Sequence, residues 1–399
     1  MEKIHTWEPE RADFSKTAIL DETLRDGIQG AQVQQEPAIE QKKTLLELME
    51  RLGIDLAMIG FPASKDDSLV LAQHITDARL HLKACCLART QEADIAMVAD
   101  IAQKTGLPME AALFVGASPI RMEVEQWDIE TIIQWVRQSV RLAKREGITV
   151  LFATEDTSRS NPATLKRIYR TAMDEGADSL CITDTVGVCT PGSAANLVKF
   201  FRNEVMEGHA LPLEWHGHND KGMGVANAMR AVEEGVWRVH ATALGLGERA
   251  GNVPMHTLVT NLHLNGADDL RPQHLMRYSE HAASMCGTII PANEPIIGRY
   301  AFSTEAGIHA AAIGKAQTPA ERDTVYSAVP ATLVGREQEI LVGPRSGTAN
   351  VLLLAQHYGM RIPSAPAIQR ILDITKKERR QLSPEEIKEL LQHAEKEPA

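Results

Sequence analysis

The sequence contains no long run of lysines or arginines and no apolar stretch that approaches about 18 residues. Its formal net charge is −11, so it lacks the basic footprint that binding to nucleic acid or to an anionic membrane requires. The N-terminal segment MEKIHTWEPERADF has no apolar region of the kind found in secretory signals. We therefore expect a cytoplasmic protein with neither nucleic acid nor membrane as a partner.

Cysteine is also scarce, and the five cysteines are odd in number and not spaced as zinc ligands. Cys85, Cys86 and Cys181 lie within apolar runs, which indicates buried thiols in a reducing compartment. The rest of the composition, 44% hydrophobic and 24% charged over 399 residues, is typical of a globular protein. A chain of this length can bury a large core without disulfides or structural metals.

Short β-rich segments alternate with amphipathic segments of helical period, such as residues 38–53 and 128–147. The first of these helices is predicted to start after Pro37 and to stop at Gly53. The eight predicted strands are TAILD (17–21), LAMIGF (56–61), LKACCLA (82–88), MEAALFVGA (109–117), ITVLFATED (148–156), SLCITDTVG (179–187), LPLEWHGHND (211–220) and RVHATALGLG (238–247).

This alternation fits either a doubly wound sheet or a (β/α)8 barrel. A doubly wound sheet rarely needs eight units, and no glycine-rich dinucleotide turn follows the first predicted strand. We therefore predict an α/β fold whose catalytic domain, residues 1–285, is a TIM barrel.

The alternation ends after about residue 270. Residues 286–345 carry turn signals and few periodic runs, so they are predicted to form an irregular arm or linker subdomain. Residues 346–399 are predicted to form a small helical C-terminal subdomain, with helices over 347–360 and 364–396. The simplest interpretation of the second of these is a solvated helical hairpin.

Polar residues gather at the predicted C-terminal ends of the strands, where the active sites of such barrels lie. The strongest signal is His216-x-His218, because residues i and i+2 of a strand project to the same face. Asp26 ends a neighbouring strand and Asn252 is available beside it, so the four residues predict a divalent-metal site. This ligand mix suits Mn, Mg, Zn or Co. Alternatively, one histidine is a core residue hydrogen-bonded to the backbone.

Three further side chains at this end have both a functional and a structural interpretation. The planar guanidinium of Arg25 matches a carboxylate, although a structural ion pair would also account for it. Thr185 could donate a hydrogen bond to the same carboxylate or be satisfied within its own strand. Glu155 is a candidate for acid–base chemistry or for orienting a water molecule.

The glycines of segment 245–252 permit a close approach of the backbone, but a lone glycine-rich loop is weak evidence for phosphate binding. Within the same segment, Glu248 and Arg249 are adjacent and could simply pair with each other.

Three motifs, in this order, resemble the signature of the metal-dependent Claisen-condensing TIM-barrel family: LDETLRDG (20–27), HGHND (216–220) and GLGERAGN (245–252). That family includes 2-isopropylmalate, homocitrate and citramalate synthases, with 3-hydroxy-3-methylglutaryl-CoA lyase as a more distant relative. The resemblance covers residues 17 to about 350, because the synthase pattern is also matched by TEDTSRS (154–160), DTVG (184–187) and FSTEAGIHAAAIGK (302–315).

The resemblance implies a role for each candidate residue. It makes Asp26, His216 and His218 metal ligands, with Asn252 as a fourth ligand or a close neighbour. Arg25 and Thr185 would bind the 2-oxo acid that reacts with acetyl-CoA.

The resemblance also assigns catalytic residues beyond this set. Glu155 and His309 would assist deprotonation of the acetyl-CoA methyl group or the later hydrolysis of the thioester. In such synthases the arm reaches the partner subunit's active site, so His309 and Tyr326 would act in trans within a homodimer. Without its motif, His309 would be interpreted as an exposed helix histidine.

The substrate implied first is 2-oxoisovalerate, which would give 2-isopropylmalate and CoA for leucine biosynthesis. Homocitrate synthases place a histidine after the third strand, where this chain has Cys86-Leu87-Ala88-Arg89. Lys221 follows HGHND where an apolar residue is more usual, so homocitrate or citramalate synthase activity stays an alternative. The chain ends at residue 399, without the long regulatory domain of typical isopropylmalate synthases, so we expect little or no inhibition by leucine.

Two other classes are disfavoured. A lyase of the same barrel needs a reactive cysteine near the eighth strand, where this chain reads GLGERAGNVPMH. A catalytically silent metal-binding regulator would not need Arg25, Glu155 and the ligand set together.

Overall fold

The computed structural model describes residues 13–395, and the chain falls into two compact units, Met1–Ile289 and Ile290–Ala399. The first twelve residues lie outside the described part, and they hold most of the N-terminal segment in which we found no secretory signal. Residue 396, the predicted end of the last helix, also lies outside it.

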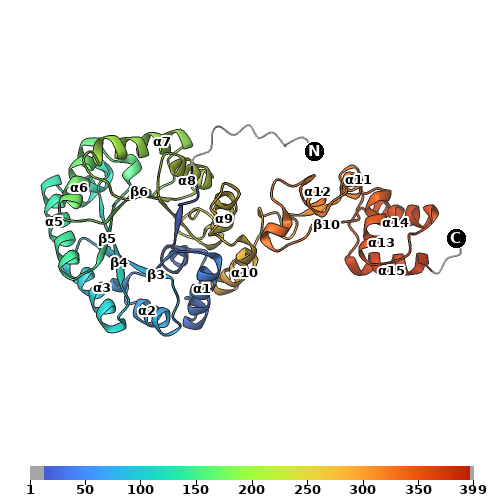
Figure 1. Cartoon of the computed structure of the whole chain (residues 1–399), viewed down its shortest axis with the longest axis horizontal. Helices are drawn as coiled ribbons and strands as arrows, with labels where there is room; N and C mark the ends of the chain where they lie inside the picture. Colours follow the sequence, from blue (N-terminus) through green and yellow to red (C-terminus); the bar gives the residue numbers. More distant parts are fainter. Residues whose placement is uncertain (1–12, 396–399) are drawn as a thin grey trace. The chain divides into compact units, whose positions relative to one another are not determined.

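The first unit is built on a closed barrel of eight parallel strands, in which each strand pairs with the next and β8 pairs with β1 (Figure 1). Each strand coincides with one of the eight predicted segments, and only β3 extends beyond its segment, by one residue to Arg89, so the predicted TIM barrel is confirmed. The strands are β1 (Ala18–Asp21), β2 (Leu56–Gly60), β3 (Lys83–Arg89), β4 (Met109–Gly116), β5 (Thr149–Glu155), β6 (Ser179–Asp184), β7 (Leu213–Gly217) and β8 (Arg238–Ala241).

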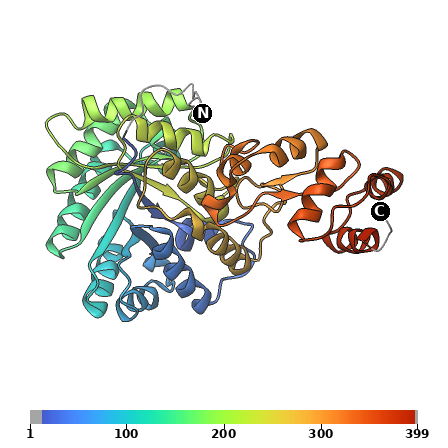
Figure 2. The ribbon, with the colours of Figure 1, turned by 45° about the vertical axis from the view of Figure 1, so that its right-hand side comes forward.

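Helices between successive strands form a ring around the barrel, as Figures 1 and 2 show. As predicted, α1 ends before Gly53, whose φ of +88° suits glycine. The Asp128 side chain caps α5 by accepting a hydrogen bond from the Thr131 N–H. The helices are α1 (Ile39–Leu52), α2 (Ser68–Asp77), α3 (Glu92–Thr105), α4 (Pro119–Glu125), α5 (Ile129–Arg145), α6 (Pro162–Asp174), α7 (Pro191–Phe200), α8 (Gly224–Glu233), α9 (Met255–Leu264) and α10 (Leu275–Cys286).

The barrel interior is apolar on one side and charged on the other. Strands β1 to β6 contribute a buried cluster of Leu20, Leu56, Met58, Cys85, Ala112, Leu151 and Cys181. On β7 and β8, the buried pair Glu214 and Arg238 stand opposite each other in register. The five cysteines are buried and free, which confirms the prediction of buried thiols.

The second unit contains a short parallel pair of strands, β9 (Ser303–Thr304) and β10 (Glu339–Ile340). Its helices are α11 (Gly307–Lys315), α12 (Pro319–Thr324), α13 (Thr348–His357), α14 (Ala365–Glu378) and α15 (Pro384–Glu395). The expected irregular arm therefore holds two short helices among its turns. The division at residue 345 into an arm and a helical subdomain stays a prediction.

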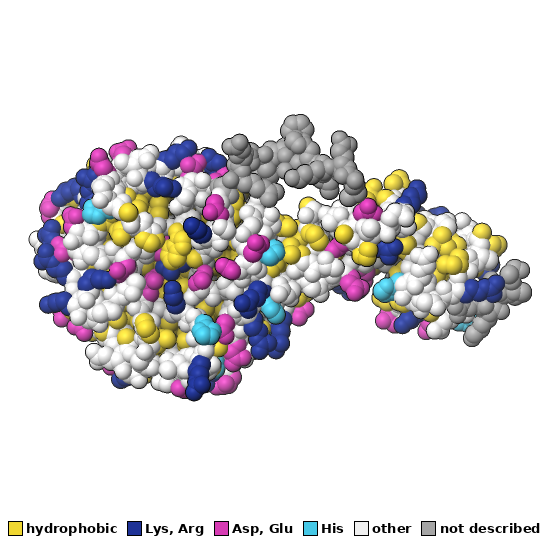
Figure 3. All heavy atoms as spheres, viewed as in Figure 1, with side chains coloured by type: hydrophobic (Ala, Val, Ile, Leu, Met, Phe, Trp, Pro, Cys, Tyr) yellow, Lys and Arg dark blue, Asp and Glu magenta, His cyan; other side chains and the backbone are white. Residues whose placement is uncertain are grey.

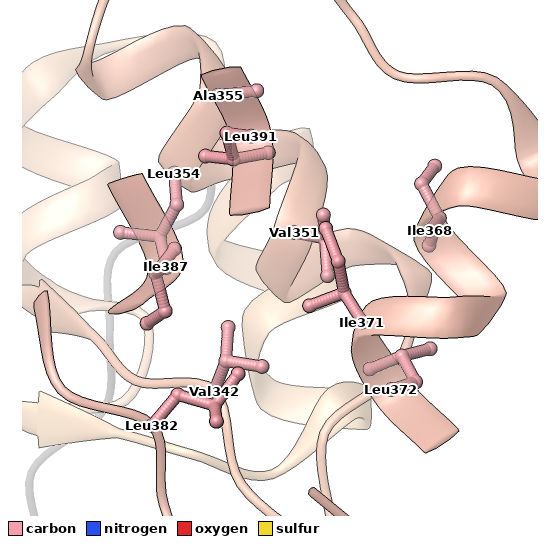
Figure 4. Close-up of a cluster of buried hydrophobic side chains, with 10 residues drawn as sticks. All are labelled: Val342, Val351, Leu354, Ala355, Ile368, Ile371, Leu372, Leu382, Ile387 and Leu391. Carbon is pink, nitrogen blue, oxygen red and sulfur yellow. The ribbon is translucent and has the colours of Figure 1, made fainter. Parts of the chain in front are cut away.

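The interpretation of the tail as a solvated hairpin is wrong. Helices α13, α14 and α15 pack around a buried apolar cluster, in which Val351, Ile371 and Leu391 come from different helices (Figure 4). The physical reason is the apolar stripe of α14, with Ile368, Ile371 and Leu372 at helical spacing, which needs a partner surface.

On the surface, lysine and arginine side chains are interspersed with aspartate and glutamate over the face that Figure 3 draws. Within residues 13–395, no helix combines the length and the apolar character needed to cross a bilayer.

Candidate metal centre

The loops after the barrel strands bring the predicted ligands to one place. A π-helical turn (Thr23–Gly27) follows β1 directly and carries Arg25 and Asp26. His216 lies in β7, and His218 follows that strand and forms an isolated bridge with Asn252. Single π-helical turns are rare and are found mainly at functional sites.

Asp26, His216 and His218 are buried and face one another. The Asp26 Oδ2 atom lies 3.7 Å from His216 Nε2 and 3.5 Å from His218 Nε2, beyond normal hydrogen-bond length. Two ligands bound at about 2.1 Å to one ion lie roughly 3 to 4 Å apart. The spacing of these three residues therefore fits a divalent cation, which the set could hold.

The electrostatics of His218 also suit a ligand. Burial, together with the neighbouring His216, lowers the pKa of its ring to about 4. A neutral ring is the form that binds a metal. Its Nδ1 atom is buried and has no hydrogen-bond partner among the described residues.

Asn252 is held beside this set by its own loop. Its Nδ2 atom donates to the Leu246 carbonyl at 3.0 Å, and the side chain is buried. Gly251 has a φ of +83°, and a Cβ there would lie 1.8 Å from the Gly245 carbonyl oxygen. The glycines of segment 245–252 thus allow the backbone to fold closely around Asn252.

The structure places Arg25, Thr185 and Glu155 around the same space. Arg25 pairs with Glu22, and its Nη1 lies 3.5 Å from Asp26 Oδ2, so the structural ion pair that we considered exists. The Thr185 hydroxyl accepts a hydrogen bond from the Asp156 N–H at 2.8 Å.

Glu155 ends β5 and is paired with a residue that sequence reasoning missed. Its Oε1 lies 3.6 Å from the Nε of Arg121, on α4. That Nε is buried without a hydrogen-bond partner among the described residues, and the Arg121 guanidinium lies over the Trp127 ring.

These residues line a cavity of about 250 Å³ at the mouth of the barrel. Its polar lining includes Asp26, His216 and His218, here called the metal set, together with Arg25, Thr185 and Glu155. Its apolar lining, here called the apolar wall, includes Met58, Leu87, Ala112, Phe114, Leu151 and Ala153. The cavity can therefore hold a small molecule that has both a charged end and an apolar end.

The two remaining predicted catalytic residues are His309 and Tyr326. They belong to the second unit, where both are exposed and their rings lie 4.1 Å apart. An exposed histidine on α11 is also what its sequence would suggest without the surrounding motif.

Sequence reasoning also missed a buried charged network beneath the metal set. It consists of the buried Glu22, Glu214, Arg238 and His240, with the half-buried Glu110 at its edge. Burial opposes ionisation of Glu22, yet Arg25 and His216 hold its pKa well below the usual range. Burial raises the pKa of Glu110 to about 7. The sequence contained a signal for part of this network. Glu214 stands two residues before His216 on β7, and Arg238 stands two residues before His240 on β8, so the two members of each pair project to the same face of their strand.

Known proteins place this barrel in a family. The HMGL-like family model matches residues 16–281, and the chain belongs to that family. The solved structure of the HMG-CoA lyase of Bacillus subtilis covers 69% of this chain and 96% of its own, with a TM-score of 0.59 at 18% identity. At that identity the likeness supports the fold alone.

Two relatives are synthases. The chain is 32% identical to the 2-isopropylmalate synthase of a Geobacillus species, over 83% of this chain and 64% of the relative. It is 30% identical to the homocitrate synthase AksA of Methanopyrus kandleri, over 89% of this chain and 85% of the relative. The chain thus spans somewhat less than two thirds of the length of the first.

Proposed function

We propose that this chain is an acyltransferase that condenses acetyl-CoA with a 2-oxo acid and releases CoA. The observation that carries the proposal is the cavity, where an ion-binding set, an arginine and a carboxylate face one space. Similarity to 2-isopropylmalate and homocitrate synthases supports this chemistry.

Each residue has a role in this reaction. Arg25 binds the carboxylate of the 2-oxo acid and Thr185 donates a hydrogen bond to it. When bound by Asp26, His216 and His218, with Asn252 beside them, a divalent cation (Mn, Mg, Zn or Co) would polarise the 2-oxo carbonyl as a Lewis acid.

Glu155 is the proposed base of the condensation. It removes a proton from the acetyl methyl group, whose carbon then bonds to the 2-oxo carbon, and the former oxo oxygen takes up a proton. Water finally cleaves the thioester to a carboxylate and free CoA thiol. Arg121 lies beside Glu155 and is in place to fix the direction of its carboxylate.

The apolar wall supports 2-oxoisovalerate as the acid, with 2-isopropylmalate as the product. Leu87 of β3 stands in that wall and offers no partner for a second carboxylate. Lys221, which departs from the synthase pattern, donates to the Val188 carbonyl at 2.8 Å and does not line the cavity. Homocitrate synthase activity on 2-oxoglutarate is the second candidate, because one relative carries that name.

We also propose that the protein works as a homodimer in which His309 and Tyr326 complete the partner's active site. The exposure of both side chains on the second unit, with ring centroids 4.1 Å apart, supports this arrangement.

The test is thiol release from acetyl-CoA across a panel of 2-oxo acids, with and without a chelator. We expect the highest kcat/KM with 2-oxoisovalerate, and loss of activity with chelator that Mn²⁺ or Mg²⁺ restores. No thiol release with any acid at saturating metal would refute the synthase. A preference for 2-oxoglutarate would favour the second candidate.

A further inference from the structure

Glu22 is a buried carboxylate whose two oxygens face different partners. Its Oε2 pairs with the guanidinium of Arg25. Its Oε1 lies 2.6 Å from Nδ1 of His240 and 3.3 Å from Nδ1 of His216. One side chain therefore contacts a residue of the metal set and the arginine beside it.

The contact with His216 decides which ring nitrogen faces the cation. A carboxylate on Nδ1 keeps the proton there, and the lone pair of Nε2 is then directed toward Asp26. His218 has no such support, because its Nδ1 has no hydrogen-bond partner among the described residues. His216 is thus the ligand whose orientation depends on a neighbouring carboxylate.

Glu22 is itself held in place by the other residues of the charged network. His240 lies between two carboxylates, with its Nε2 3.0 Å from Glu214, so both ring nitrogens face acceptors. Glu214 accepts two hydrogen bonds of 2.7 Å from Arg238, which donates a further one of 2.6 Å to Glu110. The network joins β4, β7 and β8 to the turn after β1, so Glu22 has little freedom to rotate.

Stability alone is a weak reason for such a network. Burying several charges costs solvation free energy, and well-packed apolar residues of similar size often replace buried ion pairs at no cost in stability. The location of the network, directly beneath the metal set, points to orientation of the residues above it.

We propose that Glu22 is a positioning residue that orients His216 toward the cation and Arg25 toward the carboxylate of the substrate, and that His240 holds Glu22 in place. The part that concerns His216 depends only on the metal set. The part that concerns Arg25 rests on the proposed function.

The Glu22→Gln variant of the full chain tests the proposal, because it keeps the size of the side chain and removes its charge. Titration calorimetry with Mn²⁺ should show one ion per chain and an affinity about 10- to 100-fold lower than that of the wild type. The KM for 2-oxoisovalerate should also rise, whereas the KM for acetyl-CoA should stay within about twofold, because the proposed function assigns Arg25 to the 2-oxo acid and not to acetyl-CoA. Glu22→Asp should fall between wild type and Glu22→Gln.

Glu110→Gln is the matched control, since it makes the same substitution in the same network, at a carboxylate that accepts its hydrogen bond from Arg238. It should leave the affinity for Mn²⁺ within about twofold. Circular dichroism and thermal melting establish that each variant is folded. If Glu22→Gln fails to fold, Glu22→Asp carries the test.

Several results would overturn the inference: wild-type Mn²⁺ affinity in a folded Glu22 variant, equal weakening in Glu110→Gln, or a second ion in the wild type that Glu22→Gln removes. The last would make Glu22, His216 and His240 ligands themselves. If wild-type protein turns over no 2-oxo acid, the proposed function fails, while the Mn²⁺ titration still decides the role of Glu22 toward His216.

Discussion

Asp26 and His218 lie 3.5 Å apart in the metal set, and each offers one ligand atom to a shared cation. We expect Asp26→Ala and His218→Ala each to lower kcat/KM by more than about 100-fold and to weaken Mn²⁺ binding strongly. Thiol release and titration calorimetry measure the two effects. Asp100→Ala, which removes an exposed carboxylate paired with Lys104, serves as the control. Turnover that survives in Asp26→Ala would contradict the ligand assignment.

Asp21 supports the turn that carries these ligands. It accepts hydrogen bonds from the Thr23 backbone N–H and hydroxyl and from the Tyr278 hydroxyl, inside the protein. Burial raises its pKa from 3.8 to about 6, although these hydrogen bonds act in the opposite direction. Between those values the folded state holds a proton that the unfolded state releases, so the stability contributed by Asp21 falls as the pH rises through this window.

An asparagine at position 21 cannot titrate, and its side-chain oxygen can still accept hydrogen bonds from Thr23. Relative to Asp21→Asn, the wild type should therefore lose roughly 3 kcal/mol of unfolding free energy between about pH 4 and pH 7. Urea unfolding of both proteins at several pH values measures this difference. The exposed Asp100→Asn should show the wild-type pH dependence. Parallel pH curves for wild type and Asp21→Asn would show that Asp21 is ionised throughout.

At the scale of elements, the loop after β8 shows why a glycine motif need not bind phosphate. Gly251 lies at a φ of +83° with the Gly245 carbonyl where its Cβ would be, and the Asn252 side chain occupies the equivalent space at Gly247. The motif therefore serves a close approach of backbone to backbone, which holds Asn252 against His218. The adjacent Arg249 pairs with Asp220, not with Glu248 as its position in the sequence suggested.

Gly251→Ala should lower the unfolding free energy by at least about 2 kcal/mol. The strain of an alanine in the left-handed region and the clash of its Cβ with the Gly245 carbonyl add together. The substitution should also weaken Mn²⁺ binding through displacement of Asn252. Gly208→Ala is a close control, since Gly208 has a φ of +84° but open space around it. The unfolding free energy of that variant should fall by only about 1 to 2 kcal/mol, and its affinity for Mn²⁺ should equal that of the wild type. Equal losses in both would mean that the loop relaxes around an added methyl group.

On the scale of the whole molecule, the residues of the proposed reaction are divided between two units. The metal set, Arg25 and Glu155 line one cavity of the barrel, whereas His309 and Tyr326 belong to residues 290–399. An enzyme arranged in this way can recover activity from two inactive chains if each supplies what the other lacks.

Asp26→Ala and His309→Ala should each be inactive alone. After mixing under conditions that allow subunits to exchange, about a quarter of the wild-type activity should return, because about half of the dimers are mixed and each has one intact site. Thiol release measures the recovery. A mixture of Asp26→Ala with His218→Ala should stay inactive, because the metal site of every barrel then lacks one ligand. No recovery in the first mixture would place His309 in the active site of its own chain.

The sequence by itself determined the barrel, its eight strands and the strand ends at which polar residues gather. Strand and helix periodicity is local, and a two-residue step such as His216 to His218 has only one geometry on a strand. The burial of Cys85, Cys86 and Cys181 followed equally from the apolar runs around them.

Only the tertiary structure decided which side chains and helices contact one another. Glu22 meets His240 and Glu155 meets Arg121 across long separations in the chain, and α14 packs against α13. No periodicity encodes such contacts. A charge-rich tail suggested a solvated hairpin because the surface that buries its narrow apolar stripe lies elsewhere in the sequence. Local pattern thus determines which face of an element is apolar or charged, whereas packing decides what that face meets.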